Sequence, residues 1–202
     1  RVADHSLSGL ATPARIALGR AGGSLPTAAW LDFQLGHAMA RDAVHQPFEM
    51  EPLEREMARL GHQSVVVQTR AGDRATYLRR PDLGRRLDEE SRGRLVAESA
   101  PCDLSITLTD GLSALAIHRQ AVPLIERLLP RLAKENWQIA PLVIAPFGRV
   151  ALQDDVGAAQ QARVSLILVG ERAGLSSPDS MGAYLVYGPK VGNTDAMRNC
   201  VS

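Results

Sequence analysis

The sequence predicts an α/β fold: a parallel sheet with flanking helices, preceded by a mainly helical N-terminal region. The first observation is a set of three apolar runs of strand length: DLSITLTD (103–110), WQIAPLVIA (137–145) and RVSLILVG (163–170). Helical segments separate them, and strand–helix–strand–helix–strand is typical of a parallel sheet. The second observation is that residues 27–61 carry apolar residues at helical spacing instead of in alternation.

The N-terminal region is expected to contain an irregular arm, two helices and one strand. Residues 1–26 are rich in Gly, Ser, Pro and Arg and predict the arm. The first helix, over 27–46, carries four apolar residues on one face: Leu31, Leu35, Ala38 and Met39. The second has an apolar face of Leu53, Met57 and Leu60. Gly61 ends that helix, and QSVVVQT (63–69) predicts a short strand.

Residues 70–95 contain eight arginines and little apolar periodicity. Composition favours a solvated basic connector. The functional interpretation is a contact surface for a phosphate or an acidic partner, with five arginines expected there: Arg74, Arg79, Arg80, Arg85 and Arg86. The change in pattern places a soft domain boundary near residue 98. It divides an N-terminal helical and irregular region with the arginine-rich connector, 1–98, from an α/β domain, 99–202.

The elements of the second domain follow in order after the first strand. A helix over 111–135 has a core face made of Val122, Ile125, Leu128, Leu129 and Leu132. A shorter helix follows the second strand and starts with Asp154 and Asp155, where the helix dipole favours carboxylates. After the third strand, residues 171–200 are rich in Gly, Ser, Pro, Asp and Asn and are expected to form one long loop. Loops of this length in compact domains are usually functional or disordered.

Three polar turns that contain glycine lie where the strands of the predicted sheet end: 110–113, 146–150 and 170–172. Ligands of open parallel sheets bind outside the carboxyl ends of the strands, so we expect the binding site there. No G-x-G-x-x-G follows a strand and no G-x-x-x-x-G-K-[ST] occurs. The patterns typical of dinucleotide and nucleoside triphosphate sites are therefore absent.

No residue carries a convincing catalytic or metal-binding pattern. Ser113 lies in DGLSAL, which lacks the second glycine of a nucleophile elbow, and is better interpreted as a helix N-cap. His118 is expected to be packed or exposed, and Glu171 has no acid–base partner at convincing spacing. The two cysteines and five histidines form no zinc spacing. We assign no catalytic residue and no metal site.

Composition limits the classes of function. An apolar content of 45% is ordinary for a soluble protein with a core. A net charge of +1 gives no reason to expect nucleic acid or an anionic membrane surface as a partner. No apolar run approaches the roughly 20 residues of a membrane helix. Two cysteines fit a reducing, cytoplasmic compartment.

Five long motifs occur in order along the chain: TPARIALGRAGGSLPT (12–27), DRATYLRRPDLGRRL (73–87), LTDGLSALAIHRQAV (108–122), FGRVALQDDVG (147–157) and the stretch from Gly170 to Cys200. Together they resemble the small subunit family of ethanolamine ammonia-lyase. The resemblance covers the chain from about residue 12 onward. The family continues for some tens of residues beyond the position of Ser202, so we expect part of its contact surface to lie there.

The resemblance implies an adenosylcobalamin-dependent lyase that converts ethanolamine to acetaldehyde and ammonia. The large subunit would be catalytic, and this chain would be a Rossmann-like domain that helps to bind the corrin in a cytoplasmic hetero-oligomer, with enclosure in a bacterial microcompartment left open. Three positions match cofactor contacts of the family: Val150 in FGRVAL, Glu171 in GER and Cys200 in RNC. Without the resemblance they would be a core valine, a solvated glutamate and a buried free cysteine.

The resemblance also bears on the lower ligand of the cobalt. The D-x-H-x-x-G motif, whose histidine replaces the benzimidazole of the cofactor in some cobalamin enzymes, is absent. We therefore expect the benzimidazole to stay on cobalt. Two other hypotheses remain. One is a self-contained α/β enzyme or small-ligand-binding domain that uses Asp110, Ser113 and Glu171, and the other is an interaction subunit that docks through the arginine-rich segment.

Overall fold

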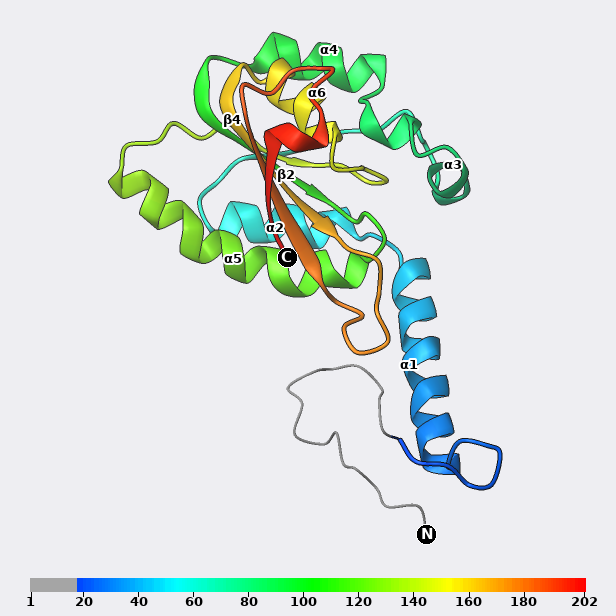
Figure 1. Cartoon of the computed structure of the whole chain (residues 1–202). Helices are drawn as coiled ribbons and strands as arrows, with labels where there is room; N and C mark the ends of the chain where they lie inside the picture. Colours follow the sequence, from blue (N-terminus) through cyan, green and yellow to red (C-terminus); the bar gives the residue numbers. More distant parts are fainter. Residues whose placement is uncertain (1–17) are drawn as a thin grey trace.

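The computed structural model describes residues 18–202, which build one six-stranded sheet with helices on both faces (Figure 1). The strand order is β1-β3-β2-β4-β5-β6. Neighbours among the first four are parallel, whereas β5 is antiparallel to β4 and β6 to β5. The bounds are β1 (Ser64–Val66), β2 (Cys102–Thr109), β3 (Leu142–Ile144), β4 (Ala162–Gly170), β5 (Met181–Tyr187) and β6 (Arg198–Val201). This confirms the predicted α/β class with a mostly parallel sheet.

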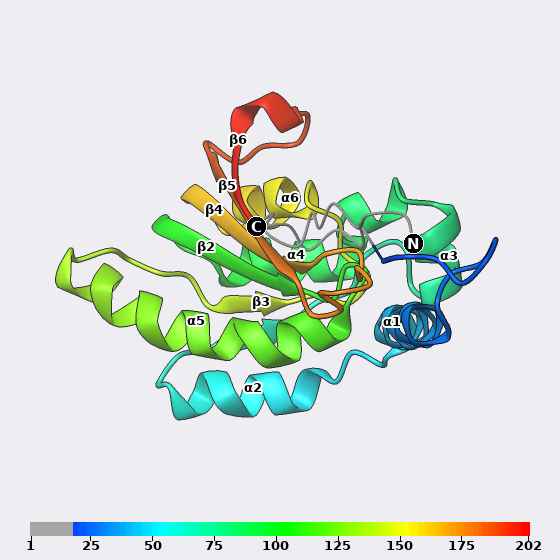
Figure 2. The ribbon, with the colours of Figure 1, turned by 60° about the horizontal axis from the view of Figure 1, so that its bottom comes forward.

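The helices form two layers around the sheet. Helices α2 and α5 cover one face and α4 and α6 the other (Figure 2). Between residues 18 and 202, no helix is long and apolar enough to cross a membrane. The bounds are α1 (Thr27–His45), α2 (Met50–Arg59), α3 (Arg74–Arg79), α4 (Glu89–Glu98), α5 (Ala114–Lys134) and α6 (Leu152–Ala159), with 3-10 helices η2 (Leu83–Arg85) and η3 (Asp195–Met197).

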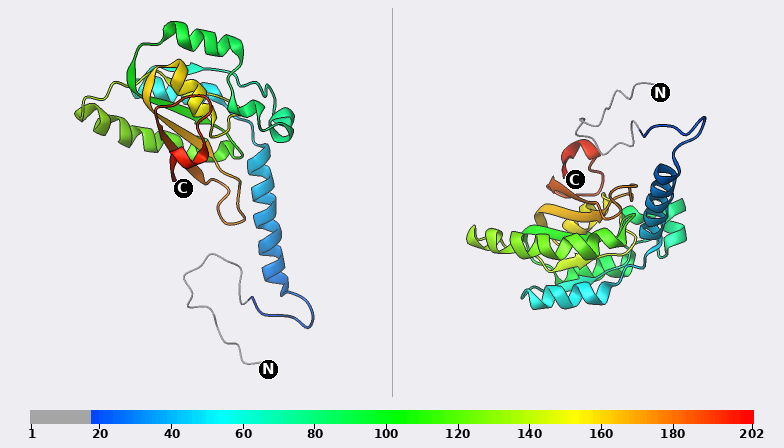
Figure 3. Two further views of the ribbon diagram at one scale, coloured as in Figure 1. Left: turned by 45° about the horizontal axis from the view of Figure 1, so that its top comes forward. Right: turned by 90° about the horizontal axis from the view of Figure 1, so that it is seen from below.

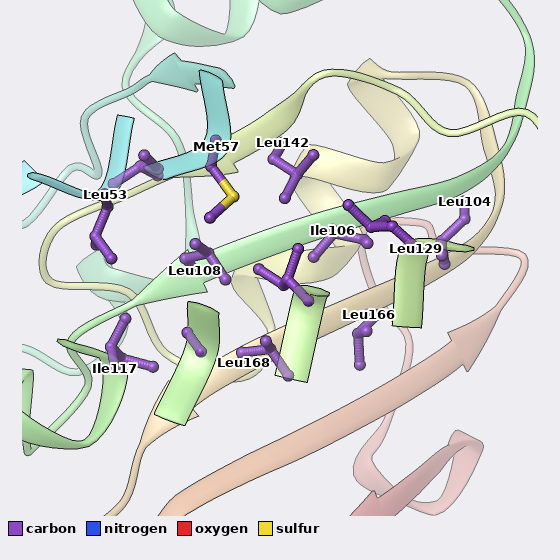
Figure 4. Close-up of a cluster of buried hydrophobic side chains, with 13 residues drawn as sticks. Leu53, Met57, Leu104, Ile106, Leu108, Ile117, Leu129, Leu142, Leu166 and Leu168 are labelled. Atoms are coloured by element: carbon purple, nitrogen blue, oxygen red, sulfur yellow. The ribbon is translucent and has the colours of Figure 1, made fainter. Parts of the chain in front are cut away.

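The larger core lies between the sheet and the layer of α2 and α5 (Figure 4). Leu53 and Met57, from the predicted apolar face of α2, are buried in it. Gly61 follows α2 with a φ of 78°, a left-handed conformation that favours glycine and ends the helix as predicted. In α5, Ile125 and Leu129 are fully or almost fully buried, which confirms the predicted core face.

Helix α1 is confirmed as a helix, but its apolar face is not part of a core. It projects away from the sheet (Figures 1 and 3). Leu31 is 57% exposed and Leu35 is 61% exposed. Spacing of apolar residues predicts which face of a helix is apolar, and it does not specify what covers that face.

The arginine-rich segment is more regular than its composition suggests, because it contains α3, η2 and α4. Side chains of Asp73 and Asp88 cap α3 and α4 by accepting from the backbone amides three residues on. The composition change near residue 98 falls between α4 and β2. Strand β1, from before that position, pairs with β3, from after it.

The prediction of one long loop over 171–200 is wrong. Only about ten residues separate β4 from β5, and β5 and most of β6 lie within the predicted loop. The apolar run MGAYLVY was obscured by the Gly, Ser and Pro residues around it. Strand β6, RNCV, is a short and largely exposed edge strand, and such a strand needs no apolar alternation.

Candidate functional site

Two adjoining cavities lie beside the carboxyl ends of β3 and β4 and extend over β5 and β6. The first cavity has a volume of about 620 Å³ and the second about 390 Å³. They share three lining residues: Arg149, Val150 and Tyr184. The first is also lined by Pro81, Arg85, Ala151, Asn193, Thr194, Asp195, Arg198 and Cys200, and the second by Tyr77, Gly111, Leu112, Val169, Gly170, Glu171 and Arg172.

The structure brings the three sequence-predicted site residues to these cavities. Val150 lines both, Glu171 lines the second and Cys200 lines the first. They come from the turn after β3, from the end of β4 and from β6. Cys200 is exposed instead of buried, and Val150 and Glu171 are half-buried.

The turn after β3 is fixed by hydrogen bonds to the end of β2. The backbone amide of Phe147 donates to Asp110 Oδ1 at 2.7 Å, and the amide of Gly148 donates to Thr109 Oγ1 at 2.8 Å. A Cβ on Gly148 would lie 2.5 Å from that hydroxyl oxygen, so the turn needs glycine at this position. These contacts place the next two residues, Arg149 and Val150, in the shared wall.

Asp110 is buried, with 2% of its surface exposed, and it bonds to Arg74 at 3.0 Å. Burial raises the pKa of this carboxyl to about 6, and the guanidinium of Arg74 opposes the shift only in part. Arg74 also donates to the carbonyls of Gly111 and Val44. The pair therefore joins α3, the turn after β2 and the end of α1, and it supports the site without lining it.

Arg149 is held against the ring of Tyr77. Its guanidinium carbon lies 4.1 Å from the ring centroid, and its Nη2 donates to the Tyr77 carbonyl at 3.3 Å. Arg74 lies 5.3 Å from the same ring centroid. Tyr77 is 1% exposed, and burial raises the pKa of its hydroxyl to about 12. A buried aromatic ring thus positions one cation of the shared wall.

Glu171 is oriented by two hydroxyl groups. Its Oε2 accepts hydrogen bonds from Ser180 Oγ and Ser202 Oγ, both at 2.8 Å. Its backbone amide donates to the Ser180 carbonyl at 3.0 Å. The carboxylate is therefore held at the edge of the second cavity by the loop that connects β4 to β5.

Tyr184 and Cys200 are direct neighbours in the pairing of β5 with β6. Burial, and then a hydrogen bond with Cys200, raise the pKa of the Tyr184 hydroxyl to about 12. The phenol is therefore neutral near pH 7. Together the two side chains form a partly polar section of the wall of the first cavity.

A buried ion pair anchors the segment that carries η3 and β6. Arg198 donates to both carboxylate oxygens of Asp154 at the start of α6, at 2.6 and 3.1 Å. The two side chains are 3% and 4% exposed. Arg198 also bonds to Asp195, and Asn193 donates to Asp154. The predicted place of Asp154 at a helix start is confirmed, and its partner is a residue that the sequence did not indicate.

The other candidate groups take part in structural bonds. Ser113 caps α5 by accepting from the amide of Ala116, as predicted, and its hydroxyl donates to the carbonyl of Pro178. His118 accepts from the backbone amide of Glu49, and burial lowers its pKa. Within residues 18–202, no group of three or more His, Cys, Asp or Glu side chains is placed to hold a metal ion.

Sequence reasoning missed Tyr77, Arg149, Tyr184 and Arg198 as parts of the site. The only available signal was their position inside the long motifs. Two of the five arginines expected at a contact surface are engaged within the chain, Arg74 with Asp110 and Arg80 with Asp82. A third, Arg85, lines the first cavity.

A family model and several similar known proteins all point to one family. A model of the family "Ethanolamine ammonia-lyase light chain (EutC)" matches residues 6–202. A protein of Xanthomonas campestris named ethanolamine ammonia-lyase small subunit is 53% identical over 195 residues, which cover 95% of this chain and 72% of that protein. Small subunits of Azotobacter vinelandii and Pseudomonas putida are 54% and 53% identical, with the same coverage.

Proposed function

This chain belongs to the family of ethanolamine ammonia-lyase light chains, the small subunits of that lyase, and we propose that it helps to bind adenosylcobalamin against the catalytic large subunit. The complex would convert ethanolamine to acetaldehyde and ammonia. The observation that carries the proposal is that Val150, Glu171 and Cys200, which match cofactor contacts of the family, all line two adjoining cavities.

The chemistry of the two cavities fits a corrin. Cobalamin has an apolar ring system, rims of neutral amides and one phosphodiester, and the wall offers apolar, hydrogen-bonding and cationic side chains. Protein pockets usually have volumes of about 300–1,000 Å³, and cobalamin is a large ligand. Both cavities are open, so this chain would form one wall of the site and the large subunit the other.

Each matched residue has a distinct part in this proposal. Val150 offers an apolar contact to the ring system. Glu171 has one carboxylate oxygen occupied by two serine hydroxyls, which leaves Oε1 to accept from an amide of the cofactor rim. Cys200 and Tyr184 close the wall at β6. When bound, adenosylcobalamin supplies the radical chemistry, and this chain positions it and excludes water.

We propose no catalytic group in this chain. A self-contained enzyme would depend on Asp110, Ser113 and Glu171, and all three have structural partners. Asp110 pairs with Arg74, Ser113 caps α5, and Glu171 accepts from two serine hydroxyls. We also propose that the cobalt keeps its benzimidazole. The described histidines, His37, His45, His62 and His118, line neither of the two cavities.

The two free cysteines, Cys102 and Cys200, fit a cytoplasmic location.

Substitution in β6 tests the proposed site with a matched control. Cys200 lines the first cavity, whereas its neighbour Val201 is 65% exposed and lines neither cavity. Cys200→Phe should fill part of the cavity and reduce cobalamin retained by the complex with the large subunit, and Val201→Phe should not. The corrin absorbance that elutes with protein on a sizing column measures the effect. Equal retention by wild type and Cys200→Phe would argue against this site.

The same column separates the proposal from its alternatives. Cobalamin is mixed with the chain alone, with the large subunit alone and with both. A binding role predicts that most corrin elutes with the complex. If the chain assembles with the large subunit but adds nothing to corrin retention, a pure interaction subunit is the better description.

A further inference from the structure

The wall of the two cavities carries more positive than negative charge. Its cations are Arg85, Arg149, Arg172 and Arg198, and its carboxylates are Glu171 and Asp195. Arg198 is neutralised by Asp154 and Asp195. Within residues 18–202, none of the other three arginines forms an ion pair with a carboxylate. The cavities therefore contain arginines that have no anionic partner. The three positions matched to cofactor contacts give no reason for these charges.

Arg149 is the best prepared of these cations. Stacking on Tyr77 at 4.1 Å and the bond from Nη2 to the Tyr77 carbonyl fix the plane of the guanidinium. Its backbone amide donates to the Gly84 carbonyl at 2.7 Å. Its Nε is buried and has no partner among the described residues. Because the side chain is already ordered, an anion that binds it loses less free energy to ordering than it would at a mobile arginine.

Arg85 is brought to the same wall by the close packing of η2. Gly84 lies against the turn after β3, where a Cβ would be 2.7 Å from the Phe147 carbonyl oxygen and 3.0 Å from the Tyr77 ring. This approach places Arg85 at the first cavity, where Arg149 also lies. Arg85 is exposed. Its charge helps to lower the pKa of Asp82, but within residues 18–202 it forms no ion pair. Two unpaired arginines from opposite halves of the chain thus line one cavity.

We propose that Arg149, supported by Arg85, binds the phosphodiester of the nucleotide tail of cobalamin. This inference rests on the proposed function and assigns two binding residues beyond the three matched positions. The amide rims of the corrin are neutral, so the phosphodiester is the group of this ligand that an unpaired arginine can neutralise. Charge-assisted hydrogen bonds from a planar guanidinium to phosphate oxygens are strong and directional.

The test compares two ligands that differ in the anion. Cyanocobalamin has the phosphodiester and benzimidazole, and cobinamide has the same corrin without them. Equilibrium dialysis of the complex with the large subunit, read by corrin absorbance, gives both dissociation constants. We expect Arg149→Gln to weaken cyanocobalamin about 10- to 100-fold, as loss of a hydrogen bond to a charged group does, and to change cobinamide less than about 2-fold. Arg127→Gln, an exposed arginine of α5 that lines neither cavity, is the matched control and should change neither.

Each other outcome overturns the assignment. Equal losses for both ligands would mean that Arg149 acts through packing on Tyr77, and no loss for either would mean that the phosphate binds elsewhere. If Arg149→Gln does not fold, Arg85→Gln takes its place, because that side chain is exposed, and the same selective loss is expected. A wild-type complex that binds neither ligand would refute the proposed function itself. One that binds cobinamide as tightly as cyanocobalamin would refute only the phosphate subsite.

Discussion

Asp110 shows how one buried residue controls the edge of the sheet. It accepts from the turn after β3, and it pairs with Arg74, which also bonds to the end of α1. These bonds favour the ionised carboxylate. The cost of burying its charge is larger than the gain from the bonds, however, and the pKa of Asp110 rises to about 6. The ionised form therefore costs stability near neutral pH.

Asp110→Asn should change how stability depends on pH. The ordinary pKa of this group is 3.8 and its folded pKa is about 6, so the folded chain holds one more proton than the unfolded chain between these values. Stability contributed by protonated Asp110 is complete below pH 3.8 and is lost as pH rises through 6. Relative to the variant, wild type should lose up to ~3 kcal/mol over this interval. Urea unfolding at a series of pH values measures it, and parallel profiles would contradict the raised pKa.

The proposed cofactor raises a second question about single residues, namely whether a histidine of the protein binds its cobalt. If the benzimidazole stays on cobalt, no histidine nitrogen coordinates the metal. Electron paramagnetic resonance of the cob(II)alamin state, in a complex with nitrogen-15 only in the protein, should show hyperfine splitting from unlabelled cofactor nitrogen. Splitting that follows the protein label would mean a histidine ligand. His5, the remaining histidine of the chain, lies outside the described residues.

At the scale of elements, β6 is attached to the body by its pairing with β5 and by the side chain of Arg198. This short edge strand pairs with β5 alone, and the buried pair of Arg198 and Asp154 links it to α6. Breaking a buried ion pair from one side leaves an uncompensated charge, which is much more costly than the loss of an exposed pair.

Arg198→Met should lower the free energy of unfolding by ~3–5 kcal/mol and open the first cavity. Arg119→Met, which removes an ion pair whose arginine is 59% exposed, should cost no more than ~1 kcal/mol. Chemical denaturation compares the two, and hydrogen exchange of residues 193–201 reports on the local opening. Similar costs for both variants would mean that the buried pair does not anchor β6.

Helix α1 and helix α2 should differ in their sensitivity to substitution. Leu35 is 61% exposed, so Leu35→Gln should change the free energy of unfolding of this chain by less than ~0.5 kcal/mol. Met57 is fully buried, and Met57→Ala should cost ~2–5 kcal/mol. Thermal unfolding of the two variants measures the contrast. A large loss from Leu35→Gln would mean that α1 packs against the chain in a way that its exposure does not indicate.

The burial of an element decides whether its position can be predicted from the sequence. Strands β2 and β4 are covered on both faces and have continuous apolar runs, so their positions were evident. Strands β5 and β6 lie toward an edge, and their pattern was obscured by polar neighbours. Val150, Glu171 and Cys200 came from resemblance to a family. Arg149 and Tyr77 could not be found in this way, because their importance depends on a stacking contact between residues 72 positions apart.

For the whole molecule, the proposal predicts that activity belongs to the assembly. A small subunit implies a larger partner subunit, and Asp110, Ser113 and His118 are engaged in structural bonds. The purified chain with adenosylcobalamin should release no ammonia from ethanolamine above the background of an enzyme-free control. Addition of the large subunit should restore release. Ammonia release by the chain alone would refute this division of roles.

The first cavity is assembled from three stretches that are far apart in the chain: Arg85 before β2, Arg149 to Ala151 after β3, and residues between Tyr184 in β5 and Cys200 in β6. A partly folded chain in which any of the three is undocked lacks a wall. A small molecule that binds in this cavity should therefore act as a chemical chaperone, because it binds the folded chain and not the unfolded one. At 100 times its dissociation constant it would favour the folded chain by about 2.7 kcal/mol, so the supply of such a molecule during synthesis should control how much intact chain accumulates.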